Sequence, residues 1–193
     1  MINLLQTIAN IDNLIYVWVM SLWNPLVFKL ALVITNIGGT ISIGLLFLVS
    51  ILVLIFKKKY RHAILLTIGL GGAVILEIIL KHLIARPRPL LGLIEETGFS
   101  FPSAHAMIAV TFFGLLIYIF KDSFKNKLGK GIFIGGLSLL IILIGLSRVY
   151  LGVHWFSDVV AGFALGTLWA TFSLLLTNRA FASRKEPQKF VDM

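Results

Sequence analysis

Residues 102–120 read PSAHAMIAVTFFGLLIYIF and join a short polar motif to a long apolar run. The run, Met107–Phe120, holds no charged residue, and about 20 such residues in a helix cross the ~30 Å hydrocarbon core of a bilayer. Four further runs are almost free of charge: Thr40–Phe56, Ala63–Leu80, Gly131–Leu146 and Val159–Thr177. Because the runs are continuous and do not alternate between polar and apolar residues, they favour helices over a β-barrel. We predict an all-α integral membrane bundle with five transmembrane helices.

The composition of the whole chain agrees with a membrane protein. Of its 193 residues 59% are hydrophobic and 13% are charged, whereas a soluble domain carries about 25% charged residues. We expect one membrane domain over 1–193, with an N-terminal interfacial region (3–36), a transmembrane core (37–177) and a cytoplasmic tail (178–193). The chain has no cysteine, which excludes disulfides and thiol chemistry.

Residues 3–23 carry polar side chains that make a poor span, together with Trp and Tyr side chains that suit the headgroup level. We interpret them as an interfacial helix on the outer face, with a sixth span as the alternative. Gly38-Gly39 indicates a close helix contact or a bend, and three glycines of the second run, Gly69, Gly71 and Gly72, indicate close helix packing.

The net charge of +9 is explained by membrane topology, so we expect no nucleic acid partner. Cations gather in three segments that lie on one side if each run crosses once: Lys57, Lys58, Lys59 and Arg61; Lys121, Lys125, Lys127 and Lys130; Arg179, Arg184, Lys185 and Lys189. The positive-inside rule makes that side cytoplasmic. The opposite ends of the runs then lie at the outer face of the membrane, and the C-terminus is cytoplasmic.

Two polar clusters at the outer ends of the runs suit an anion. Lys81 ends the second run and Arg88-Pro89 follows; lone cations at such a place usually extend to the membrane edge. Ser103, Ala104 and His105 follow Pro102 at the start of the next helix. A helix N-terminus offers free backbone N–H groups and a positive dipole, which bind anions. Helix capping explains Ser103 equally well, but capping does not require His105.

A third cluster contains Ser147-Arg148, His154 and Asp158. His154 and Asp158 are four residues apart, so on a helix they share a face. Asp158 can then fix the imidazole tautomer and leave the other ring nitrogen free, as in sites where an acid orients a catalytic base. Glu77 lies inside a run one turn before Lys81, and because intramembrane acids are usually paired we expect a salt bridge between them.

The three clusters together resemble the three-part signature of the type 2 phosphatidic acid phosphatases, which share an ancestry with vanadium haloperoxidases and glucose-6-phosphatase. The matching motifs are Lys81-x6-Arg88-Pro89, Pro102-Ser103-Ala104-His105 and Ser147-Arg148-x5-His154-x3-Asp158. The resemblance covers roughly residues 10–177. The family usually has Gly where Ala104 stands.

The resemblance implies a metal-independent lipid phosphate phosphatase with no cofactor. His154 would attack phosphorus, Asp158 would orient it, and His105 would protonate the leaving oxygen. Lys81, Arg88 and Arg148, with Ser103 and the Ala104 N–H, would bind the phosphate, and Glu77 and Ser147 would support them.

We expect the substrate to be a membrane lipid, with phosphatidylglycerophosphate, undecaprenyl pyrophosphate, phosphatidic acid and diacylglycerol pyrophosphate as candidates, and no required protein partner. Compact size indicates a bacterial plasma membrane protein with an outward-facing site. The alternatives are a lipid phosphotransferase using the same site and a transporter or scaffold that binds anionic lipids without chemistry. The transporter would need the cations but not two histidines and an orienting aspartate.

Overall fold

The computed structural model describes residues 4–182, which form helices and connecting segments without a β-strand. The helices are α1 (Leu4–Ser21), α2 (Pro25–Ile37), α3 (Thr40–Phe56), α4 (Tyr60–Ile84), α5 (Ala104–Phe120), the 3₁₀-helix η1 (Lys121–Ser123), α6 (Lys127–Tyr150) and α7 (Phe156–Ala182). The predicted all-α membrane bundle is confirmed.

The helices extend past most of the apolar runs that predict them. Only α3 has the bounds of its run, because backbone hydrogen bonding in the other helices continues into polar residues at their ends. α7 continues to Ala182, past residue 178, where the predicted cytoplasmic tail begins. The rest of the predicted cytoplasmic tail, 183–193, lies outside the described residues.

Four helical segments are long and apolar enough to cross a membrane: Tyr60–Ile84, Ala104–Ser123, Lys127–Tyr150 and Phe156–Ala182. α2 and α3 together make a fifth candidate, bent by 42°. The bend falls at Gly38-Gly39, where a Cβ on Gly38 would lie 2.6 Å from Cγ2 of Ile144 in α6. Both interpretations of this glycine pair are therefore correct, since it allows a bend and a close contact.

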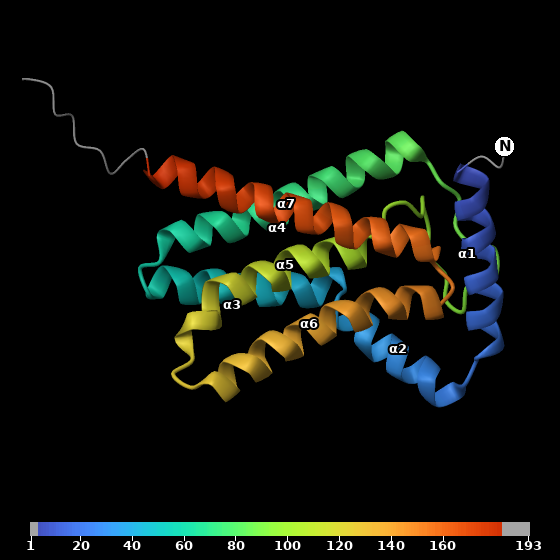
Figure 1. Cartoon of the computed structure of the whole chain (residues 1–193), viewed down its shortest axis with the longest axis horizontal. Coiled ribbons are helices and arrows are strands. Elements are labelled where there is room, and N and C mark those ends of the chain that lie inside the picture. The colour runs from blue at the N-terminus through green and yellow to red at the C-terminus, as the bar shows by residue number, and fades with distance from the viewer. Residues whose placement is uncertain (1–3, 183–193) are drawn as a thin grey trace, which may run out of the picture.

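α1 lies across one end of the bundle, whereas α4 to α7 run along its length (Figure 1). It is not among the candidate spans found in the described part of the chain. This orientation favours the interfacial helix over the sixth span.

α5 lies at the centre of the bundle and packs against α4, α6 and α7 (Figure 1). Its contact with α7 is close because Gly162 and Gly166 of α7 face the α5 backbone. A Cβ on Gly162 would lie 2.8 Å from the Ser103 carbonyl oxygen, and one on Gly166 would lie 2.5 Å from that of Met107. Small residues spaced by four allow helices in membranes to approach this closely, and here they hold the start of α5 against the start of α7.

Candidate active site

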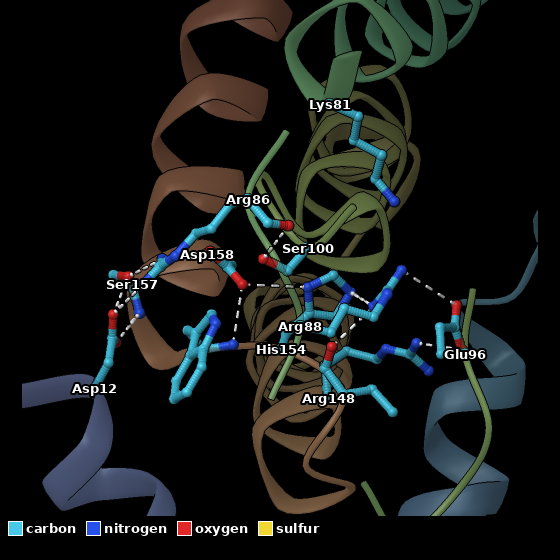
Figure 2. A network of polar contacts seen from close by, with 12 residues as sticks. Asp12, Lys81, Arg86, Arg88, Glu96, Ser100, Arg148, His154, Ser157 and Asp158 are labelled. Atoms are coloured by element: carbon cyan, nitrogen blue, oxygen red, sulfur yellow. Dashed lines mark hydrogen bonds and ion pairs between the residues drawn. The ribbon is translucent and has the colours of Figure 1, made fainter. Parts of the chain in front are cut away.

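The three sequence clusters meet at the end of the bundle that α1 crosses. Each contributes from a helix terminus or a connection: Lys81 from the last turns of α4, Arg88 from the 85–103 connection, Ser103, Ala104 and His105 from the start of α5, Arg148 from the end of α6, His154 from the α6–α7 connection and Asp158 from the first turn of α7. Figure 2 shows Lys81, Arg88, Arg148, His154 and Asp158 around one polar centre.

His154 lies between a carboxylate and a guanidinium. Its Nδ1 is 3.6 Å from Asp158 Oδ2, slightly too far for a hydrogen bond, and its Nε2 is 3.2 Å from Arg88 Nη1. Asp158 is fully buried, and its Oδ2 also accepts from the Trp155 backbone N–H at 3.0 Å. Asp158 therefore faces Nδ1, which leaves the Nε2 lone pair directed at the cationic side of the site.

Burial lowers the pKa of His154 to about 4, and the charges of Arg148 and Arg88 act in the same direction, while Asp158 opposes them. The imidazole is therefore neutral near pH 7. A neutral ring is the form that can attack phosphorus.

Two arginines are held in place by backbone and side-chain acceptors. Arg88 donates to the carbonyl oxygens of Val153 at 2.8 Å, Gly98 at 3.1 Å and Thr97 at 3.1 Å. Arg148, only 2% exposed, donates from Nη1 to Thr35 Oγ1 at 2.9 Å. Its Nε has no hydrogen-bond partner among the described residues. Because an unpaired buried donor is costly, this geometry suits an anion with several oxygens.

Glu96 is the carboxylate that contacts both arginines. Its Oε2 lies 2.8 Å from Arg148 Nη2, and its Oε1 lies 3.9 Å from Arg88 Nη2. Burial raises the pKa of Glu96, but Arg148, Arg88 and His105 together hold that pKa below its ordinary value. An anion that binds these arginines would compete with this side chain.

Ser103 lies at the N-terminus of α5 and is fully buried. Its N–H donates to the Asp158 backbone oxygen at 3.0 Å, which joins the second motif to the third. The capping role that its type favours is not seen, because Ser103 Oγ makes no cap bond and has no partner among the described residues. The hydroxyl thus remains available to a ligand, beside Ala104 and His105.

The supporting residues differ in how they reach the site. The expected salt bridge between Glu77 and Lys81 is present at 3.0 Å. Ser147 is buried, but its hydroxyl donates within α6 to the Ile144 carbonyl oxygen at 2.7 Å, so it supports the helix that carries Arg148.

Sequence reasoning missed three ionic residues around the predicted site. Arg86 Nη1 lies 2.6 Å from Asp158 Oδ1, and Arg86 Nη2 lies 2.7 Å from Asp12 Oδ2. Asp12 is one of the polar residues that make 3–23 a poor span, and the sequence assigns no role to Arg86 or Glu96. The one signal that could have indicated a role for Arg86 is its nearness to the Arg88 motif.

A cavity of about 300 Å³ lies between α3, α4 and α5. Its lining is mostly apolar, with Ile43, Leu70, Val74 and Ile108, and it reaches His105 and Glu77. The space beside His105 therefore suits an apolar group.

Among residues 4–182, no three His, Asp or Glu side chains are arranged to hold a metal ion.

Known proteins resemble this chain in sequence. The PAP2 superfamily model matches residues 62–182. Phosphatidylglycerophosphatase B of Bacillus subtilis is 35% identical over 143 residues, which cover 70% of this chain and 68% of that protein. Undecaprenyl-diphosphatase of Sulfolobus acidocaldarius is 35% identical over 131 residues, which cover 64% of this chain and 59% of that protein.

A solved structure agrees over a longer stretch. The crystal structure of the transmembrane PAP2 type phosphatidylglycerolphosphate phosphatase from Bacillus subtilis superposes with a TM-score of 0.81 at 26% identity, covering 95% of this chain and 90% of that one. The resemblance found in the three motifs is confirmed.

Proposed function

Because this chain belongs to the PAP2 superfamily and is a hydrolase of the lipid phosphatase type, we propose that it removes phosphate from a membrane lipid through a phosphohistidine at His154. The substrate is a phosphomonoester or diphosphate, with phosphatidylglycerophosphate and undecaprenyl pyrophosphate as the leading candidates, since relatives are named for activity on them.

The observation that carries this proposal is the position of His154. Its Nδ1 faces a buried carboxylate and its Nε2 faces Arg88. A phosphate held by Arg88, Arg148 and Lys81 would present phosphorus to that nitrogen. Phosphoryl transfer depends mainly on such positioning and charge stabilisation, and three cations with the Ser103 hydroxyl supply both.

The proposed reaction has two steps. In the first, His154 Nε2 attacks phosphorus, the bond from phosphorus to the lipid oxygen breaks, and His105 protonates that oxygen. In the second, His105 takes a proton from water, the water oxygen attacks phosphorus, and the N–P bond breaks to release phosphate. Asp158 stabilises the positive charge on the His154 ring between the steps.

The cavity between α3, α4 and α5 supports a lipid leaving group. It places apolar surface beside His105, the proposed acid. A lipid chain in this space would bring its ester oxygen to His105 and its phosphate to the cations.

The charge distribution supports an outward-facing site in a bacterial plasma membrane. Exposed cations of the α3–α4 and α5–α6 connections lie at the end opposite the site (Figure 1). By the positive-inside rule that end is cytoplasmic, and α7 ends there too.

Phosphate release by the purified full-length protein tests the proposal. We expect release from at least one lipid in a panel of phosphatidylglycerophosphate, undecaprenyl pyrophosphate, phosphatidic acid and diacylglycerol pyrophosphate, and its loss in His154→Ala. Transfer of labelled phosphate to an acceptor other than water would instead indicate a phosphotransferase. Lipid binding without any phosphate release would sink the enzymatic proposal.

A further inference from the structure

Besides Asp158, the buried carboxylate Asp12 lies beside the site, on a helix outside the matched family region. α1 is mostly exposed, yet Asp12 is 2% exposed. Its Oδ2 accepts from Arg86 Nη2 at 2.7 Å and from Ser157 Oγ at 2.6 Å, and its Oδ1 accepts from the Ser157 N–H at 2.9 Å. A buried carboxylate is unfavourable unless it is paired in this way.

Arg86 connects Asp12 to Asp158. Its Nη1 donates to Asp158 Oδ1 at 2.6 Å and to Ser157 Oγ at 2.7 Å, while its Nη2 binds Asp12. Figure 2 shows the guanidinium between the two carboxylates. The contacts form a continuous path from Asp12 through Arg86 and Asp158 to His154.

The charges along this path have a consequence for His154. Arg86 alone would neutralise Asp158, and the ring that becomes positive during the reaction would face a neutral pair. Asp12 adds a second negative charge, so the three groups carry a net charge of −1. Opposite charges favour one another more strongly where water is excluded, and Asp12 and Asp158 are both buried.

We propose that Asp12, Arg86 and Ser157 position Asp158 and keep its surroundings negative, so that α1 completes the active site. They are positioning residues, because they act through Asp158. The proposal rests on the function proposed above, in which His154 becomes positively charged. It assigns the N-terminal helix a part in the chemistry.

The alternative is that Asp12 only anchors α1 to the bundle. Other contacts also anchor this helix: Tyr16 OH donates to the Leu91 carbonyl oxygen at 2.8 Å, and the Tyr16 ring lies 5.8 Å from that of Trp155. They allow the two roles to be separated, because Tyr16→Phe removes an anchoring hydrogen bond and leaves every charge in place.

The experiment measures kcat and KM for a hydrolysed lipid with the purified full-length protein. Asp12→Asn keeps the size of the side chain and removes its charge. We expect kcat to fall about 10- to 100-fold at unchanged KM, by analogy with the loss typical when a partner that orients a metal-ligating histidine is removed. Asn13→Ala, at an exposed neighbouring position, and Tyr16→Phe should both keep the wild-type kcat.

A double-mutant cycle tests whether Asp12 acts through Arg86. Arg86→Gln should lower kcat, and Asp12→Asn combined with Arg86→Gln should lower it by less than the product of the two single losses, because both changes act on Asp158. Independent, multiplicative losses would overturn the proposed path.

Three results would overturn the proposal: an Asp12→Asn protein with wild-type kcat, a loss confined to KM, or an equal loss in Tyr16→Phe, which would show anchoring. If Asp12→Asn does not fold, Ser157→Ala decides, since it weakens the hold on Asp12 and Arg86 without changing charge. We expect a lower kcat at unchanged KM, and a wild-type kcat would refute the network. An inactive wild-type protein would refute the proposed function itself.

Discussion

His105 and His154 occupy different surroundings, which predicts different effects of removing them. His154, the proposed nucleophile, is 2% exposed and lies between Asp158 and Arg88. His105 lies in the first turn of α5 and lines the apolar cavity, where the proposed leaving group would lie. We expect His154→Ala to abolish turnover of every lipid, because no other nucleophile takes its place.

The effect of His105→Ala should depend on the leaving group. A monoester releases a lipid alkoxide that needs a proton, whereas a diphosphate releases a lipid phosphate that is already a stable anion. General acid catalysis contributes about 10²- to 10⁴-fold, so the first step on a monoester should slow by about that factor and the first step on a diphosphate by less. The pre-steady-state burst of lipid product measures this step alone, whereas steady-state turnover would also include the second step, in which we propose that His105 acts as a base. An active His154→Ala with an inactive His105→Ala would reverse the two roles.

The low pKa of His154 predicts how the protein responds to acid. Burial lowers that pKa from 6.5 to about 4, so the unfolded chain takes up this proton before the folded one as pH falls. His154 therefore contributes stability that is fully present above about pH 6.5 and is lost as pH falls toward 4. We expect the ¹⁵N chemical shifts of His154, assigned with His154→Gln, to show a neutral ring down to about pH 5. Protonation near pH 6.5 would contradict the buried environment.

The sequence predicts the part of the site that a short separation along the chain brings together. His154 and Asp158 are four residues apart, and they lie close together even though His154 precedes α7 and is not itself helical. Asp12 and Arg86 lie 74 positions apart, and no periodicity relates two residues brought together by folding alone. Asp12 could be assigned a partner only once α1 was seen to cross the end of the bundle.

At the scale of elements, the close contact between α5 and α7 positions the site residues at the start of each helix. A Cβ on Gly166 would lie 2.5 Å from the Met107 backbone oxygen and would also clash with Val110 Cγ1. Since backbone cannot move aside as a side chain can, we expect Gly166→Ala to destabilise the protein by about 1–3 kcal/mol, as overpacking typically does. It should also lower activity, because the helix it displaces carries Ser103 and His105.

Gly71→Ala is the matched control. It is also a helical glycine, but a Cβ there would meet nothing within 4 Å, and Ala is favoured over Gly inside a helix by roughly 0.5–1 kcal/mol. Thermal unfolding in one detergent should show a lower Tm for Gly166→Ala and an equal or higher Tm for Gly71→Ala. Equal behaviour of the two variants would mean that the close contact does not limit stability.

The apolar runs of the sequence predict the helices, but they do not predict which residues of one helix contact another. The five runs each lie within a helix, because hydrophobic length decides which segments enter a membrane. The trio Gly69, Gly71 and Gly72 was expected to pack as a group, yet only Gly69 and Gly72 face neighbours, Leu115 and Trp169. The direction of a residue around a helix depends on where the other helices lie, which the sequence does not record.

At the scale of the whole molecule, the candidate site and the exposed lysines of two connections lie at opposite ends. The end crossed by α1 holds the two histidines with Lys81, Arg86, Arg88 and Arg148, all engaged with site residues or aimed at them (Figure 2). Ion pairs with buried or half-buried carboxylates reduce the net charge of this end. The exposed lysines of the α3–α4 and α5–α6 connections have few such partners, so they are the charges that can set orientation.

This asymmetry predicts the result of a labelling experiment on intact cells. The native chain has no cysteine, so single cysteines can be introduced without background. Glu95→Cys lies in the exposed part of the connection between α4 and α5, at the site end, and Ser123→Cys is an exposed position at the opposite end. A membrane-impermeant thiol reagent should label Glu95→Cys and spare Ser123→Cys, and permeabilisation should make both react. The reverse pattern would place the site in the cytoplasm. The positively charged loops would then face outward, so the orientation of the protein would have to be set by a signal other than the distribution of Lys and Arg.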